Sequence, residues 1–267
     1  MNLVYLGSPE MAVAPLEALV AAGHDVRLVV TGRDKRRGRG GATSPTPVKA
    51  AALGLGLVVS HDLDDAVGVG ADLGVVVAFG RLVPVGILER LPMINLHFSL
   101  LPRWRGAAPV ERAILAGDGT TGVCVMEVAE GLDTGGVFAR EEGPIESTTT
   151  ADELRRTLVR VGSALLVDTL DRGLGHPAPQ VGESTYAAKL TVADRRIDWS
   201  APAEQIGRVV RIGGAWTTFR GARVKIHDMV IDDGSVVPTV VQPEGRSSMP
   251  YDEWLRGVRP APGEWFE

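Results

Sequence analysis

Several apolar segments with little polar alternation dominate the first hundred residues: "NLVYLG" (2–7), "HDVRLVVTG" (24–32), "DLGVVVAFG" (72–80) and "MINLHFS" (93–99). A strand with one solvated face alternates apolar and polar residues, whereas a strand buried on both faces does not. The segments between them have helical character, as in "TPVKAAALGLG" (46–56). Buried strands separated by helices predict an α/β fold with a parallel sheet covered on both faces.

Local signals place the ends of some of these elements. Ser8 is expected as the N-cap of the helix after the first strand, with Pro9 at its first position and Gly23 at its end. After residue 182 no strong period is visible until a helix-like stretch (202–214) and short strands within 215–231. We therefore predict a large α/β domain over 1–181, a linker over 182–200 and a small β-rich domain over 201–267.

Composition and motifs argue against several classes of protein. Cys124 is the only cysteine, so no intrachain disulfide is possible. The first ten residues lack the basic start of a signal peptide, and no apolar run approaches the roughly 20 residues that span a membrane. No histidine or cysteine spacing indicates zinc, and the turn "LGSPEMA" lacks the glycines of a dinucleotide fingerprint. We expect a soluble, monomeric, cytoplasmic protein without a metal.

Two polar side chains, Asn95 and His97, interrupt the apolar segment 93–99. Residues two apart on a strand point to the same side, so both should face one direction. Pro102 ends the segment soon after His97, which places the pair near the carboxyl end of the sheet, where open parallel sheets bind ligands. An amide that stabilises an oxyanion beside an imidazole that moves a proton suits acyl transfer. A purely structural histidine is the alternative that these residues leave open.

A third candidate is Asp133 in the glycine-framed segment "EGLDTGG" (130–136). An aspartate in such a turn commonly serves the turn itself. If this loop folds over the same strand end, Asp133 can orient the imidazole of His97 and stabilise its charged form. Spacing alone does not decide between these two roles.

The distribution of charge matters more than its sum. The formal net charge of −5 taken alone argues against a nucleic-acid-binding protein, which needs a basic surface. The segment "TGRDKRRGRGG" (31–41), however, carries five basic residues and one aspartate. This basic loop joins a strand to a helix and is the candidate phosphate-binding segment.

With these residues in view, the chain resembles the methionyl-tRNA formyltransferases, a branch of the folate-dependent formyltransferases. The pair "NLHFSLLPRWRGAAP" (95–109) and "GLDTGG" (131–136) resembles the signatures of the folate-dependent enzymes. The segments "GRGG…SPTPVKAAA" (38–52) and "TYAAKLTVADRRIDW" (185–199) are similar to the tRNA-formylating branch. The resemblance implies a Rossmann-like formyltransferase domain, a linker and a C-terminal β-barrel of the OB type.

The resemblance also implies a reaction and its residues. The formyl donor would be 10-formyltetrahydrofolate, and the acceptor the α-amine of methionine on initiator tRNA, with no metal. Asn95, His97 and Asp133 match the family's catalytic asparagine, histidine and aspartate. The folate-contacting run corresponds to Ser99, Leu100, Leu101 and Pro102. Arg39 matches a basic residue of the loop that the family uses on tRNA, and its neighbours Lys35, Arg36 and Arg37 are assigned to the same surface.

The C-terminal segment departs from the family pattern. An OB barrel needs five strands, and the chain after residue 214 has room for three or four. Residues 201–267 hold eight basic and nine acidic side chains, so they form no obvious phosphate-binding surface. Besides formylation of methionyl-tRNA, two functions stay open: formylation of another amine, such as an amino-sugar nucleotide, and a non-catalytic folate- or RNA-binding module.

Overall fold

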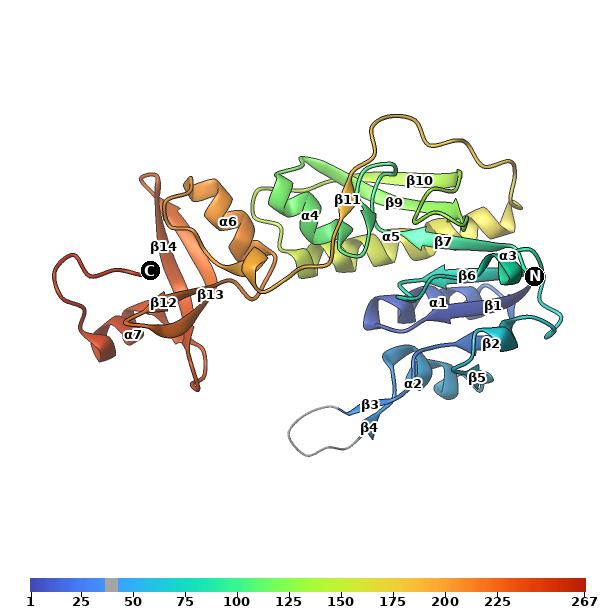
Figure 1. Cartoon of the computed structure of the whole chain (residues 1–267), viewed down its shortest axis with the longest axis horizontal. Helices are drawn as coiled ribbons and strands as arrows, with labels where there is room; N and C mark the ends of the chain where they lie inside the picture. The colour runs from blue at the N-terminus through green and yellow to red at the C-terminus, as the bar shows by residue number, and fades with distance from the viewer. Residues whose placement is uncertain (37–42) are drawn as a thin grey trace. The chain divides into compact units, whose positions relative to one another are not determined.

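The structure is a computed structural model of the whole chain, and it describes residues 1–36 and 43–267 (Figure 1). The chain forms two compact units. The first comprises Met1–Pro109, Thr120–Pro144 and Arg155–Ala187, and the second comprises Val110–Gly119, Ile145–Leu154 and Ala188–Glu267. The second unit therefore draws two short segments from the middle of the chain in addition to its C-terminal part.

The first unit is built on a mixed sheet. Within the described residues its strands number seven, in the spatial order β10 (Val137–Pro144), β9 (Thr120–Glu127), β7 (Met93–His97), β6 (Leu73–Val77), β1 (Asn2–Gly7), β2 (Asp25–Val30) and β5 (Val59–Ser60). The five strands from β7 to β5 are parallel, whereas β9 runs antiparallel to both of its neighbours. The predicted α/β fold with a buried parallel sheet is confirmed.

The strand order reverses next to β1. The chain moves outward from β1 to β2 and β5, then returns to the other side of β1 with β6 and β7. This is the order of a Rossmann-like sheet, in which ligands bind beyond the carboxyl ends of the strands near the reversal. The loops after β1, β2, β6 and β7 are therefore the segments in which to look for a site.

Apolar residues cover both faces of this sheet. On one face they come from strands, from the 3-10 helix η2 (Asp64–Ala66) and from α3 (Val85–Leu88), and the cluster contains Val4, Leu6, Leu28, Val30, Leu63, Ala66, Val76, Phe79, Ile87, Leu91 and Met93. The long helix α5 (Ala151–Asp171) packs on the other face, where a Cβ added at Gly162 would lie 3.1 Å from the side chain of Leu96. Glycine thus lets this helix lie close to β7, the strand with the polar pair.

The helix after β1 begins later than predicted. A 3-10 turn, η1 (Glu10–Ala12), precedes α1 (Val13–Ala21), and neither has a side-chain cap. The Ser8 hydroxyl accepts a hydrogen bond from the Gly32 amide at 3.1 Å instead, so the N-cap prediction for Ser8 is wrong. Gly23, at φ +84°, does end α1 as predicted. Further along the chain, α2 (Pro47–Gly54) is capped by the Thr46 hydroxyl.

The second unit combines α4 (Pro109–Ala116, from Val110 on), the 3-10 helix η3 (Ala193–Arg195) and α6 (Ala203–Arg211) with an antiparallel sheet. Within the described residues this sheet has four strands in sequence order: β12 (Trp216–Phe219), β13 (Ala222–Asp232), β14 (Ser235–Pro243) and β15 (Met249–Pro250). A C-terminal antiparallel sheet domain is thus present, as predicted. The four strands are one fewer than an OB barrel has.

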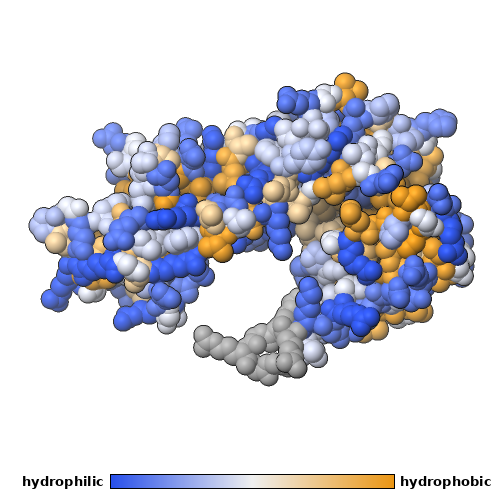
Figure 2. Space-filling model, in the orientation of Figure 1, coloured by the Kyte–Doolittle hydropathy of each residue, from blue (hydrophilic) through white to orange (hydrophobic). Residues whose placement is uncertain are grey.

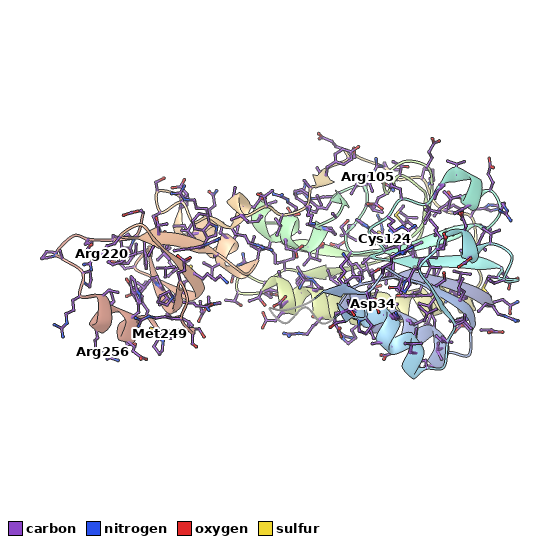
Figure 3. All side chains as sticks on the ribbon, turned by 60° about the horizontal axis from the view of Figure 1, so that its bottom comes forward. Asp34, Arg105, Cys124, Arg220, Met249 and Arg256 are labelled. Carbon is purple, nitrogen blue, oxygen red and sulfur yellow. The ribbon has the colours of Figure 1, made fainter. Side chains whose placement is uncertain are left out.

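A helix that the sequence analysis did not anticipate, α7 (Tyr251–Val258), completes this unit. Its Trp254 stacks on Phe266, at 5.4 Å between ring centroids, and packs edge-on against Phe219 at 4.9 Å. Arg220, labelled in Figure 3, holds the C-terminal segment through two hydrogen bonds to the carboxylate of Glu264. On the face drawn in Figure 2 the surface of this unit is mainly hydrophilic, while apolar residues gather over part of the first unit.

No helix in the parts of the chain that the structure describes is long and apolar enough to cross a membrane.

Candidate active site

The polar pair lies at the predicted place. Asn95 and His97 belong to β7, and His97 is its last residue. Residues two apart on a strand share a face, so both side chains lie on the same side of the sheet. On the adjacent antiparallel strand β9, Met126 stands opposite Asn95 and Cys124 opposite His97. Asn95 is half-buried, and His97 is 5% exposed.

His97 has an acceptor beside each ring nitrogen. Its Nε2 lies 2.9 Å from the carbonyl oxygen of Trp104, and its Nδ1 lies 3.7 Å from Oδ2 of Asp133. A carbonyl oxygen can only accept, so Nε2 carries a proton and donates it to Trp104. This bond fixes the tautomer, and Nδ1 becomes the nitrogen that can gain or lose a proton.

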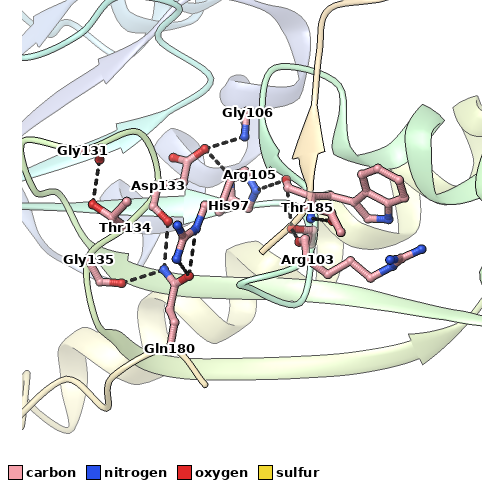
Figure 4. Close-up of polar contacts among 12 residues, drawn as sticks. His97, Arg103, Arg105, Gly106, Gly131, Asp133, Thr134, Gly135, Gln180 and Thr185 are labelled. Atoms are coloured by element: carbon pink, nitrogen blue, oxygen red, sulfur yellow. Dashed lines mark hydrogen bonds and ion pairs between the residues drawn. The ribbon is translucent and has the colours of Figure 1, made fainter. Parts of the chain in front are cut away.

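Asp133 lies close to the imidazole, as the sequence analysis considered. Its loop between β9 and β10 brings the carboxylate toward His97, but 3.7 Å is an ion-pair distance and too long for a hydrogen bond. The same oxygen, Oδ2, accepts a hydrogen bond from the Gly106 amide at 2.7 Å (Figure 4). Asp133 is thus held by the main chain, and at this distance only its charge can act on the imidazole.

The segment after β7 supplies the main-chain groups of the site. Trp104 adopts a positive φ of +64°, and its carbonyl faces His97. A short strand follows, β8 (Arg105–Gly106), which pairs in parallel with β11 (Tyr186–Ala187). Gly106 has a φ of +115°, and a Cβ there would lie 2.9 Å from the carbonyl oxygen of Ala187. Any other residue would push away the strand that keeps the Gly106 amide beside Asp133.

The four residues assigned to folate contact differ in exposure. Ser99 is fully buried, and its hydroxyl donates to the carbonyl of Arg103 at 2.6 Å. Leu101 is 5% exposed and packs in a small cluster with Cys124. Leu100 and Pro102 are half-buried, and the bond between Leu101 and Pro102 is cis. Of the four residues, only Leu100 and Pro102 are exposed enough for a ligand lying along this run to contact them.

Two residues that hold the main chain of the site, in the stretch after α5, were not predicted from the sequence. The Thr185 hydroxyl accepts a hydrogen bond from the Trp104 amide at 2.9 Å. The Gln180 side chain donates to the carbonyls of Asp133 and Gly135 at 2.9 and 2.8 Å. Gln180 lies in an irregular stretch where no periodicity or motif marks it, and Thr185, although it begins the segment "TYAAKLTVADRRIDW", has no residue-specific signal for this contact.

The basic loop after β2 is described only in part. Lys35 and Arg36 form a strand, β3 (Lys35–Arg36), which pairs with β4 (Thr43–Ser44), and Lys35 is exposed. Arg37 and Arg39 lie outside the described residues. The one aspartate of the loop, Asp34, pairs with Nζ of Lys49 on α2 at 2.8 and 2.9 Å; Asp34 is labelled in Figure 3. The charge of Asp34 is thus balanced by a residue outside the loop.

Another reactive side chain nearby is Cys124. Burial raises the pKa of its thiol, and a protonated thiol is a poor nucleophile. Outside residues 37–42, no group of three or more histidine, cysteine or acidic side chains is arranged to hold a metal ion. The site thus brings together the side-chain amide of Asn95, the imidazole of His97 and the carboxylate of Asp133, held by a main-chain carbonyl and a main-chain amide. An amide and an imidazole can together stabilise an oxyanion and transfer a proton.

Comparison with protein families decides the assignment. The family model described as "Formyl transferase" matches residues 1–170, and "Formyl transferase, C-terminal domain" matches residues 189–235. The chain belongs to the formyl transferase family. Among its formyl transferase relatives, a methionyl-tRNA formyltransferase of Roseobacter denitrificans is 44% identical over 259 residues, which cover 91% of this chain and 85% of that protein.

The alignment with another relative covers both chains completely. A methionyl-tRNA formyltransferase of a Jannaschia species is 38% identical over an alignment of 302 positions, which span 100% of this chain and of that protein. The alignment is longer than the 267 residues of this chain. The alignment therefore contains positions at which that relative has residues that this chain lacks.

Solved formyltransferases share the fold. The N-formyltransferase from Helicobacter canadensis, in complex with folinic acid and dTDP-3-aminofucose, superposes with a TM-score of 0.69 at 20% identity, covering 86% of this chain and 88% of that one. A methionyl-tRNA formyltransferase from Clostridium thermocellum gives a TM-score of 0.65 at 16% identity, covering 91% and 98%. At such identities the likeness establishes the fold of this formyl transferase, and it does not identify the molecule that accepts the formyl group.

Proposed function

We propose that this protein transfers a formyl group from 10-formyltetrahydrofolate to the α-amine of methionyl initiator tRNA. The observation that carries the proposal is the identity of about 40% with methionyl-tRNA formyltransferases over most or all of both chains. The arrangement around His97 supports it, because acyl transfer to an amine needs a proton carrier and an oxyanion donor close together.

The proposed reaction is a direct transfer. The uncharged amine attacks the formyl carbon, which forms a C–N bond and a tetrahedral oxyanion. The bond between the formyl carbon and N10 of the folate then breaks, and the proton lost by the amine ends on N10. No covalent intermediate with the protein is needed, which agrees with a buried, protonated Cys124.

Three side chains have separate roles in the proposed reaction. The amide of Asn95 donates to the oxyanion. His97, held through Nε2 by the Trp104 carbonyl, presents Nδ1 as the nitrogen that carries the mobile proton. Asp133, 3.7 Å from Nδ1, stabilises the charged ring without taking its proton. The folate donor is proposed to lie along residues 99–102, against the main chain and the side chains of Leu100 and Pro102.

The acceptor decides between the proposed function and its nearest competitor. Purified protein is expected to transfer formyl from 10-formyltetrahydrofolate to charged initiator tRNA, with an amino-sugar nucleotide in excess causing little inhibition. Product is measured as formylmethionine released from the tRNA. Preferential formylation of the amino-sugar nucleotide would contradict the proposal and favour the small-amine alternative.

Replacing Asn95 with alanine is expected to lower the rate of formyl transfer by about 10²- to 10³-fold, because one oxyanion donor is removed. The affinity for folate should stay near that of the wild type, since the amide acts on the transition state. Single-turnover transfer and folate binding are measured separately. A variant that keeps its rate would show that Asn95 has a structural role.

The basic loop is proposed to bind the acceptor arm of the tRNA. Removing one charged group that binds a phosphate reduces the slope of log affinity against log salt by roughly 0.7 to 0.9. Arg39→Ala and a Lys35/Arg36/Arg37 triple alanine variant should therefore weaken tRNA binding and flatten this slope. Transfer to a minimal acceptor without tRNA should change little.

The control for the loop variants is Arg90→Ala. Arg90 is exposed and precedes β7, at the amino end of the parallel strands and away from the edge where ligands bind. Its replacement should leave both the tRNA affinity and the salt slope unchanged. Equal slopes for the loop variants, the control and the wild type would rule out the loop as the docking segment.

A further inference from the structure

The side-chain amide of Gln180 uses its full hydrogen-bonding capacity at the site. Nε2 donates to the carbonyl oxygens of Asp133 at 2.9 Å and Gly135 at 2.8 Å. Oε1 accepts from Nε and Nη2 of Arg105 at 3.1 and 2.6 Å. The two carbonyls can only accept and the guanidinium can only donate, so these partners fix which end of the amide carries oxygen.

These four bonds join the two segments that hold the reactive groups (Figure 4). Asp133 and Gly135 belong to the loop that carries the carboxylate. Arg105 stands between Trp104, whose carbonyl holds Nε2 of His97, and Gly106, whose amide holds the carboxylate of Asp133. Gln180 therefore links the loop of Asp133 to the main chain that holds both members of the His97–Asp133 pair.

The conformation of Asp133 gives this link a further effect. Its φ of +49° lies in the left-handed region, which disfavours a residue with a Cβ unless its surroundings hold it there. Gln180 binds the carbonyl of this strained residue and that of Gly135, two positions later. These two hydrogen bonds hold the main chain on either side of Thr134, so the backbone at Asp133 has little freedom to leave its conformation.

The segment that presents Gln180 is itself anchored on both sides. Two residues earlier, Ala178 exchanges two main-chain hydrogen bonds with Val137, at 2.8 and 2.9 Å. A few residues later, the Thr185 hydroxyl accepts from the Trp104 amide at 2.9 Å. Gln180 thus acts from a fixed backbone, which is what an orienting side chain requires.

We propose that Gln180 is a positioning residue for formyl transfer, one that sets the place of the Asp133 carboxylate relative to Nδ1 of His97 and touches neither substrate. The inference rests on the proposed function, since it assigns Gln180 a part in that reaction. Gln180 lies in the irregular stretch after α5, outside the segments 93–106 and 130–136 that carry the reacting groups.

Gln180→Met tests the proposal, because methionine has a similar length and no hydrogen bonds to the two carbonyls. The expected result is a fall in kcat of about 10- to 100-fold, the usual cost of misplacing a reacting group. KM for folate and for tRNA, and Tm, should stay near wild type. Gln205→Met is the matched control: Gln205 is exposed on α6, and its variant should keep full activity.

A double variant separates positioning from a general structural effect. If Gln180 acts through Asp133, then Gln180→Met should have little further effect on single-turnover transfer in an Asp133→Ala background. An unchanged kcat in Gln180→Met, or an equal fall in both backgrounds, would overturn the proposal. If Gln180→Met does not fold, Gln180→Glu, which keeps the acceptor for Arg105, makes the same comparison. Absence of transfer by the wild-type protein would refute the proposed function instead.

Discussion

Replacing His97 with alanine is expected to lower formyl transfer by about 10²- to 10⁴-fold, the usual value of a group that moves a proton in the transition state. His97 is 5% exposed and its Nε2 is bound to the Trp104 carbonyl, so in the proposed reaction Nδ1 is the nitrogen left to carry the proton. Folate affinity and Tm should change far less than kcat, since the surrounding strand β7 remains. Single-turnover transfer with enzyme in excess measures the fall in rate.

Two further variants make the result for His97 specific. His97→Gln has an amide that can still donate to the Trp104 carbonyl but carries no mobile proton, and it should be as inactive as His97→Ala. His227→Ala removes an exposed histidine of β13, whose Nε2 lies 2.9 Å from the side-chain oxygen of Gln242, and it should keep full activity. Substantial transfer by His97→Gln would mean that the ring has a structural role, the alternative that its sequence context left open.

The strand with Asn95 and His97 was predictable because it depends on short-range geometry. A period of two places both side chains on one face wherever the strand lies. Proline at position 102 then ends the segment, which predicted that the pair lies near the end of the strand. The same reasoning predicted the order of buried strands and helices, because burial on both faces leaves a continuous apolar pattern.

The hydrogen bonds that hold His97 and Asp133 were not predictable, because they involve main-chain groups and residues far apart in the sequence. The acceptor for His97 is a carbonyl of Trp104, and the donor to Asp133 is an amide of Gly106. Every residue except proline has both groups, so no residue type marks them. Gln180 contacts Asp133 across 47 positions of the chain. An uncharged residue in an irregular segment gives no signal for such a contact.

Ser8 shows how tertiary structure overrides a local rule. Its position before Pro9 fits an N-cap, yet its hydroxyl accepts from the Gly32 amide at the end of a neighbouring strand. The amide of Gly32, just after a neighbouring strand, and the amides in the first turn of the helix compete as donors to the same hydroxyl oxygen. The helix α7 was not predicted, and its eight residues are fewer than the roughly 11 to 18 over which a helical period is recognised.

Replacing Asp133 with alanine is expected to lower formyl transfer by an amount similar to that for His97, on the order of 10²- to 10⁴-fold. The carboxylate has two roles that alanine removes together. It places a negative charge 3.7 Å from Nδ1 of His97, and it accepts the hydrogen bond from Gly106 at 2.7 Å. The distance to Nδ1 indicates that charge, and not a hydrogen bond, is what the imidazole gains.

Asp133→Asn separates these two roles. Its side-chain oxygen can still accept from the Gly106 amide, so the loop should keep its place, while the negative charge is removed. If the charge stabilises the protonated ring of His97, single-turnover activity should fall nearly as far in the asparagine variant as in the alanine variant, with Tm close to wild type. Wild-type activity in Asp133→Asn, combined with a large fall in Asp133→Ala, would instead assign Asp133 to holding the main chain at Gly106. Thr134→Ala is the control for disturbance of the loop itself, because the Thr134 hydroxyl donates to the nearby carbonyl of Gly131, at 3.1 Å, within the same turn.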